Sequence, residues 1–159
     1  MKVTILTVGK IKEKFYTDAI NEYVKRLSRY CRLEIVQVAD EKTSENSTEN
    51  EMDIIKQKEG DRLLKYISDD AYVITLEIEG KMLDSVELAD KINKLGVAGT
   101  SHIIFVIGGS LGLHKMVSQR ADFKLSFSKM TFPHQLMRVI LLEQIYRSYR
   151  IINKQPYHK

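Results

Sequence analysis

The stretch FVIGGSLGLHK, Phe105 to Lys115, lies between an apolar run and a short segment with helical character. Gly108, Gly109 and Gly112 follow directly after the strand-like residues HIIFVI. Glycines at the end of a strand allow the chain to turn sharply and allow a ligand to approach the backbone. The stretch therefore indicates a strand that ends in a tight turn or in the floor of a binding site.

The spacing of these glycines matches neither of two common phosphate-binding motifs. A dinucleotide fingerprint reads G-x-G-x-x-G, whereas this stretch reads G-G-x-x-G. A P-loop ends in Gly-Lys-Ser or Gly-Lys-Thr, and that ending is absent here. Since ligands of open α/β sheets bind outside the carboxyl ends of the strands, a pocket for another small molecule and a plain turn both stay open.

The bulk composition is that of a globular protein, and we predict a single domain over residues 1–159. A domain of this length buries roughly 70% of its unfolded surface. No apolar run approaches the roughly 20 residues of a membrane helix, and the first residues do not read as a secretory signal. The single cysteine, Cys31, excludes an internal disulfide framework and suits a reducing compartment. We expect a cytoplasmic protein without a membrane segment.

Positive charge is concentrated at the end of the chain. The segment 114–159 holds nine Lys or Arg residues and two acids, a net charge of +7. Because the whole chain carries +4, the remaining 113 residues sum to −3. This asymmetry indicates either a solvated basic face or a polyanionic partner at one end of the molecule.

Apolar periodicity divides the chain into alternating strands and helices. The predicted strands cover residues 1–8, 33–38, 72–78, 101–107 and 123–128. The predicted helices cover 12–30, 52–67 with a weak point at Gly60, 84–95 and 134–153, and the polar residues 40–50 and 79–81 read as a loop and a turn. Such alternation predicts an α/β domain with a mostly parallel sheet flanked by helices.

Three of the predicted strands end in segments rich in turn residues. They are the glycine stretch, Glu79-Gly80 after the strand that holds Leu76, and the Ser/Thr/Pro-bounded loop ahead of His134. Because parallel strands end at one edge of the sheet, these ends would converge on one pocket.

Three strings of the sequence together resemble one known family. FVIGGSLG at 105–112, SFSKMTFPHQLMRVILLEQIYRSYRI at 126–151 and the terminal PYHK are similar to the ribosomal RNA large-subunit methyltransferase H family. That family belongs to the SPOUT class of S-adenosylmethionine-dependent methyltransferases. The resemblance implies a SPOUT-type α/β domain with a C-terminal trefoil knot. It also implies a homodimer that methylates N3 of a pseudouridine in helix 69 of 23S rRNA on the assembled ribosome.

The resemblance also implies where the cofactor S-adenosyl-L-methionine binds. The matching positions are Leu76, Gly108, Phe127, Ser128, Lys129, Met130, Thr131 and Phe132. Leu76, Phe127 and Phe132 would supply apolar surface for the purine and the thioether, although ordinary core packing also explains such residues. We expect no metal, because Cys31 and the histidines show no ligand spacing.

The terminal residues carry the catalytic roles that the resemblance implies. His158 would accept the N3 proton, Tyr157 would stack on or orient the base, and Lys159 would contact phosphate. Relatives often end in Tyr-His-Arg, so Lys159 keeps the charge but not the bidentate geometry of Arg. In a dimer, the tail of one subunit would complete the pocket of the other.

Two residues at the start of the last helix have other expected roles. We interpret His134 as a structural residue of the helix start rather than a catalytic one, and we assign Arg138 to a dimer seam or a neighbouring pocket. The alternative to an enzyme is a non-catalytic ribosome-associated RNA-binding factor, whose glycine loop is only a turn. A nucleotide hydrolase is disfavoured because the P-loop lysine and hydroxyl are absent.

Overall fold

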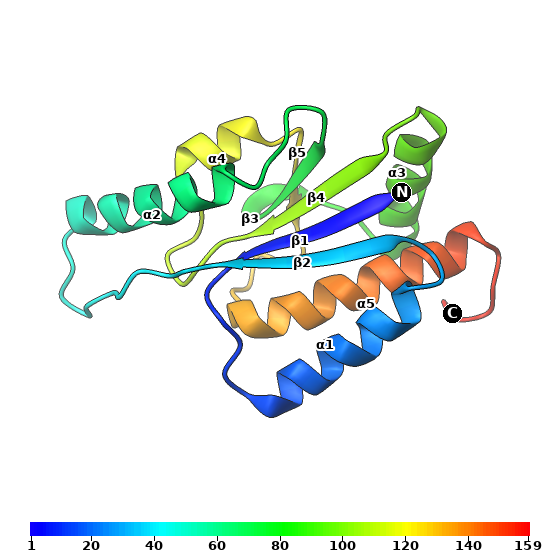
Figure 1. Cartoon of the computed structure of the whole chain (residues 1–159), viewed down its shortest axis with the longest axis horizontal. Coiled ribbons are helices and arrows are strands. Elements are labelled where there is room, and N and C mark those ends of the chain that lie inside the picture. The colour runs from blue at the N-terminus through cyan, green and yellow to red at the C-terminus, as the bar shows by residue number, and fades with distance from the viewer.

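The computed structural model describes all residues from Met1 to Lys159 and places every strand parallel to its neighbours. The strands are β1 (Lys2–Val8), β2 (Arg32–Val38), β3 (Tyr72–Met82), β4 (His102–Ile107) and β5 (Phe123–Ser126), in the spatial order β2-β1-β4-β3-β5. The helices are α1 (Lys14–Leu27), α2 (Glu49–Leu64), α3 (Ser85–Val97), α4 (Lys115–Arg120) and α5 (His134–Ile152). The predicted α/β architecture with a parallel sheet is confirmed (Figure 1).

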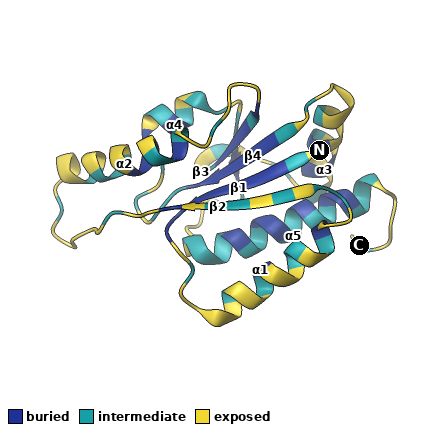
Figure 2. Ribbon diagram, viewed as in Figure 1, coloured by how far each residue is buried: buried dark blue, intermediate teal, exposed yellow.

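Both faces of the sheet are buried, because the central strands alternate their side chains between two apolar clusters. Along β4, Ile103 and Phe105 belong to one cluster, whereas Ile104 and Val106 belong to the other. The first cluster is completed by residues of α1, α3 and α5, and the second by residues of α2 and α4. Figure 2 shows the buried residues concentrated in the central strands and on the inner faces of the helices. This layering explains why the strand sequences are almost continuously apolar.

The predicted turn at residues 79–81 is wrong, because β3 continues to Met82. Its pairing with β5 slips instead: Leu76 and Lys81 both pair with Leu125, so residues 77–80 bulge out of the ladder. A Cβ on Gly80 would lie 2.8 Å from the backbone of Lys124, which explains why glycine is needed there. The strand is therefore interrupted by a bulge and not ended by a turn.

The second helix also differs from the prediction. It begins at Glu49, inside the expected loop, where Thr48 and Glu51 form a capping box. It passes through Gly60 without interruption. A Cβ at Gly60 would lie 3.2 Å from Val117 of α4, so the glycine permits close packing of the two helices. No helix combines the length and the apolar character needed to cross a membrane.

Candidate active site

A cavity of about 630 Å³ lies at the carboxyl ends of β3, β4 and β5. Four segments form its wall: the bulge of β3, the glycine stretch after β4, the loop after β5 and the first turn of α5. The predicted convergence of three strand ends is confirmed by this arrangement. The volume falls within the range of roughly 300–1,000 Å³ that is usual for small-molecule pockets.

The structure brings seven of the eight sequence-predicted cofactor residues to this one cavity, while Lys129 is not part of its wall. The seven are Leu76, Gly108, Phe127, Ser128, Met130, Thr131 and Phe132. Met130 and Phe132 are exposed at 73% and 36%, so the cavity keeps apolar side chains open to solvent. Side chains of this kind at an open cavity favour a binding role over core packing.

The glycine stretch is a tight loop that also lines the cavity, so the two alternatives left by the sequence are compatible. A Cβ at Gly108 would lie 2.8 Å from the carbonyl carbon of Gly112. Gly112 itself has a φ of +85°, the left-handed region that glycine favours, and it forms a bridge with Gly109. The glycines are thus required by the loop's own backbone, and the closed loop then forms one wall of the cavity.

Glu77 is a cavity residue that the sequence analysis did not identify. It lies in the β3 bulge, and its carboxylate accepts hydrogen bonds from Thr75 Oγ1 at 2.6 Å and from Ser118 Oγ at 2.8 and 3.0 Å. It is the one carboxylate in the wall, so it places a fixed negative charge there. The signal was Gly80, since a glycine inside a strand pattern indicates a bulge.

His134 and Arg138 occupy the first turns of α5. His134 is the first residue of the helix and lines the cavity, without a capping hydrogen bond from its side chain. Burial lowers the pKa of His134, the Arg138 guanidinium lowers it further, and Asp40 opposes the shift. These shifts favour the neutral form of His134 at physiological pH. His134 begins α5, as predicted from the sequence, and its side chain also lines the cavity.

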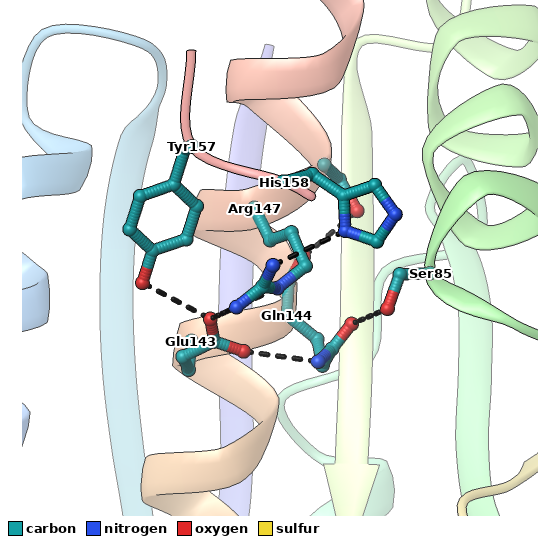
Figure 3. A network of polar contacts seen from close by, with 7 residues as sticks. Ser85, Glu143, Gln144, Arg147, Tyr157 and His158 are labelled. Atoms are coloured by element: carbon teal, nitrogen blue, oxygen red, sulfur yellow. Dashed lines mark hydrogen bonds and ion pairs between the residues drawn. The ribbon is translucent and has the colours of Figure 1, made fainter.

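Tyr157 and His158 belong to a polar network on the second half of α5 (Figure 3), whereas Lys159 is exposed. Glu143 accepts hydrogen bonds from Tyr157 Oη at 3.1 Å and from Nε and Nη2 of Arg147 at 3.0 and 2.7 Å. Arg147 also donates from Nη1 to Nδ1 of His158 at 3.1 Å, and its guanidinium lies 4.7 Å from the centre of the Tyr157 ring. Burial, followed by the hydrogen bond to Glu143, raises the pKa of Tyr157 to about 12, so its hydroxyl stays protonated.

Within one chain, this network and the cavity do not meet. Met137 is the last cavity residue of α5, whereas Glu143 and Arg147 hold the tail, six and ten residues further along the helix. At 1.5 Å per residue this is about 9 to 15 Å. Tyr157, His158 and Lys159 are absent from the cavity wall. The sequence-predicted site is therefore divided into a cavity at one end of α5 and a tail at the other.

Comparison with known proteins identifies the family of this chain. A family model described as "Predicted SPOUT methyltransferase" matches residues 1–158. The ribosomal RNA large subunit methyltransferase H of Bifidobacterium adolescentis is 64% identical, and that of Clostridium kluyveri is 57% identical, each over the full length of both chains. A probable methylase family protein of known structure from Haemophilus influenzae matches with a TM-score of 0.54 at 12% identity, covering 99% of this chain and 70% of that one. This structural likeness supports the fold alone.

The family model matches almost the whole chain, and the relatives match it over their full length. The chain belongs to the SPOUT methyltransferases, and within them to the ribosomal RNA large-subunit methyltransferase H family. No group of three or more His, Cys, Asp or Glu side chains is placed to hold a metal ion.

Proposed function

We propose that this protein uses S-adenosyl-L-methionine to methylate N3 of a pseudouridine in helix 69 of 23S rRNA, acting on the assembled ribosome. The observation that carries the proposal is the gathering of Leu76, Gly108 and the 127–132 loop around one cavity. These segments come from three different strand ends, so their convergence is a property of the fold and not of sequence proximity. The full-length relatives named as rRNA methyltransferases support the same reaction class.

The residues present fit this cofactor in size and in chemistry. Leu76, Phe127 and Phe132 offer apolar surface to a purine, and the backbone of the glycine loop offers amide and carbonyl groups. Glu77 offers a negative charge to a cationic ligand. When bound, the cofactor supplies a methyl group on a positively charged sulfur. The thioether that leaves needs no further activation, because the sulfur already carries the charge. The residues of the chain have to align the nucleophile, for which positioning contributes up to about 7–11 kcal/mol.

The proposal assigns the remaining chemistry to the tail. His158 accepts the N3 proton, Tyr157 orients the base, and Lys159 contacts phosphate. Because Tyr157, His158 and Lys159 lie outside the cavity wall of their own chain, we propose that the tail completes the cavity of a second subunit in a homodimer. Val139 and Ile140 of α5 are only half-buried, which leaves apolar surface on this helix for that contact.

Three further features belong to the proposal. The basic segment 114–159 supplies the positive charge that an RNA substrate requires. A ribosomal substrate implies a cytoplasmic location. The C-terminal part of the chain forms the trefoil knot that is expected from the family. A single domain of 159 residues has little surface for RNA, so we expect weak activity on naked rRNA and full activity on ribosomes.

The test is direct: ribosomes that lack the modification are incubated with the protein and the cofactor, and the rRNA nucleosides are read by mass spectrometry. Methyl-pseudouridine is the expected product, and its complete absence would refute the assigned activity. The competing possibility is a non-catalytic ribosome-associated RNA-binding factor. That factor predicts no saturable binding of S-adenosyl-L-methionine in calorimetry, whereas the enzyme requires it.

A further inference from the structure

A second cavity, of about 370 Å³, lies between α1, the edge strand β2 and α5. It shares no wall residue with the cofactor cavity. Half of its wall is apolar, and the other half consists of the side chains of Lys10, Thr17, Asn21, Gln37 and Arg138. All five of these side chains can donate hydrogen bonds, two of them are cationic, and no Asp or Glu belongs to the wall.

Arg138 is the unusual member of this wall. It is only 2% exposed, and it is among the largest fully buried side chains of the chain. Its Nη2 donates to the carbonyl oxygens of Val8 at 2.8 Å and Gly9 at 2.9 Å, which are neutral acceptors. Its Nε and Nη1 are buried and have no acceptor. A buried guanidinium without a counter-charge is destabilising, and buried cations are normally paired.

No carboxylate forms an ion pair with Arg138. The titratable groups near it are Lys10 in the same cavity wall, His134 one turn earlier on α5, and Asp40, which lies beside Gly9 and acts on His134 but does not bond to the guanidinium. Burial alone lowers the pKa of Arg138 to about 10, so the guanidinium stays charged at neutral pH. The site thus combines two cations and three neutral donors in the wall of a cavity large enough for a small ion, with the unpaired guanidinium nitrogens of Arg138 buried behind that wall.

We propose that this second cavity binds an oxyanion of the phosphate type, with Arg138 at its base and Lys10 at its mouth. Guanidinium groups pair with phosphate through charge-assisted hydrogen bonds, and Thr17, Asn21 and Gln37 provide further donors. The source is either free phosphate or a phosphate group of a bound RNA chain. The second source fits the position, since Arg138 directly follows Met137, a residue of the cofactor cavity wall.

The primary test is calorimetric titration of the whole protein with inorganic phosphate at constant ionic strength. We expect saturable binding, and we expect Lys10→Glu to weaken it by at least about tenfold, the effect of losing one charge-assisted contact. Lys12→Glu is the matched control: it makes the same charge change two residues away, on an exposed residue outside the wall, and should keep the affinity. If the Arg138→Gln variant folds, it should not bind phosphate. If it does not fold, Lys10→Glu still tests the proposal, because Lys10 is exposed and its replacement leaves the core intact.

The absence of saturable binding would overturn the proposal, and so would equal affinities in Lys10→Glu and Lys12→Glu. Methylation of ribosomes by the same variants distinguishes the sources of the anion, and this arm alone rests on the proposed function. A rise in KM for ribosomes with Lys10→Glu but not with Lys12→Glu identifies an RNA phosphate, whereas unchanged kinetics identify the free ion. If the protein never methylates ribosomes, the proposed function is refuted. The phosphate titration still tests the anion site, because it does not depend on methylation.

Discussion

Nη1 of Arg147 lies 3.1 Å from Nδ1 of His158, and the direction of this hydrogen bond is fixed by chemistry. A guanidinium has no acceptor, so Nδ1 must accept, and the neutral ring then carries its proton on Nε2. The Nδ1 lone pair, which would take the proton, is therefore occupied by Arg147 while the tail packs against α5 of its own chain. The tail must release His158 Nδ1 from Arg147 before that nitrogen can act as a base, which agrees with a tail that functions elsewhere.

Replacing His158 should affect the reaction and not the binding of the cofactor. We expect His158→Ala to lower kcat on ribosomes by about 10²–10⁴-fold, the usual contribution of a general base. The affinity for S-adenosyl-L-methionine should stay unchanged, because the proposal gives the cofactor to Leu76, Gly108 and the 127–132 loop and gives His158 only the proton of the base. Single-turnover methyl transfer and calorimetry measure the two quantities. A variant that loses cofactor affinity and keeps its rate would contradict the assigned role.

Mixing two inactive variants should restore activity if the tail acts across a dimer. Gly108→Ala damages the glycine loop, since the new Cβ would lie 2.8 Å from Gly112, while His158→Ala damages the tail. In a random mixture half of the dimers are mixed, and each of these holds one intact pair of cavity and tail, so about a quarter of the wild-type rate should return. The variants have to be denatured and refolded together to exchange subunits. If activity stays absent although mass spectrometry detects mixed dimers, the tail acts within its own chain.

Replacing Glu77 tests whether the cavity recognises a cationic ligand. Glu77→Gln removes the charge but keeps the shape and the capacity to bond with Thr75 and Ser118. We expect the affinity for S-adenosyl-L-methionine to fall about tenfold, with a smaller effect on the product S-adenosyl-L-homocysteine, which lacks the sulfonium charge. Glu79→Gln is the control, because Glu79 is exposed and outside the wall. Equal losses for both ligands would show that Glu77 does not sense the sulfonium.

The parts of the fold that depend on local patterns could be predicted from the sequence. Continuous apolar strands separated by amphipathic helices define the parallel sheet, and the helix expected from residue 84 begins there, with Asp84 as the N-cap of α3 in a capping box with Glu87. The gathering of strand ends follows from parallel pairing. The bulge of β3 could not be placed, because the slip between Leu76 and Lys81 depends on the approach of β5, about 45 residues further along the chain.

The sequence predicts which residues line the cavity better than it predicts the contacts that position them. Residues that line the cavity lie at strand ends, where a sequence pattern indicates them. Burial of Arg138 depends on two carbonyl groups that are 129 and 130 residues away in the chain, so no local pattern could reveal it. The position of the tail likewise depends on the chain folding back beyond the end of α5, so that Tyr157 contacts Glu143 and His158 contacts Arg147.

The lone cysteine should be chemically inert in the folded protein. Burial raises the pKa of Cys31 to about 11, while an unfolded thiol titrates near roughly 8.5. At pH 8 we expect a disulfide reagent to react about two orders of magnitude more slowly with the native chain than with the urea-unfolded chain. Because the folded state holds its thiol proton to higher pH, this group's contribution to stability is complete below pH 8.5 and is lost as the pH rises toward 11. Equal rates of reaction in both states would show that the thiol is not shielded.

Two glycine-to-alanine substitutions should shift stability in opposite directions. Gly80 lies in the bulge, where a Cβ would lie 2.8 Å from the carbonyl carbon and oxygen of Lys124 and 2.9 Å from the carbonyl carbon of Leu125. The paired backbones of β3 and β5 cannot move apart without breaking their ladder, so Gly80→Ala should destabilise the fold by about 1–3 kcal/mol and weaken cofactor binding through the displaced Glu77. Gly96 lies in α3, where a new Cβ would meet only the flexible end of Met1 at 3.6 Å.

Gly96→Ala should therefore stabilise the chain by about 0.5–1 kcal/mol, because alanine favours the helix and restricts the unfolded chain. Urea unfolding of both variants beside the unaltered protein measures the two free energies, and cofactor titration measures the second effect of Gly80→Ala. Since both changes add the same methyl group, a difference in sign isolates the backbone contact between β3 and β5. If Gly80→Ala proved as stable as Gly96→Ala and kept full cofactor affinity, the bulge would not be what holds Glu77 in the cavity wall.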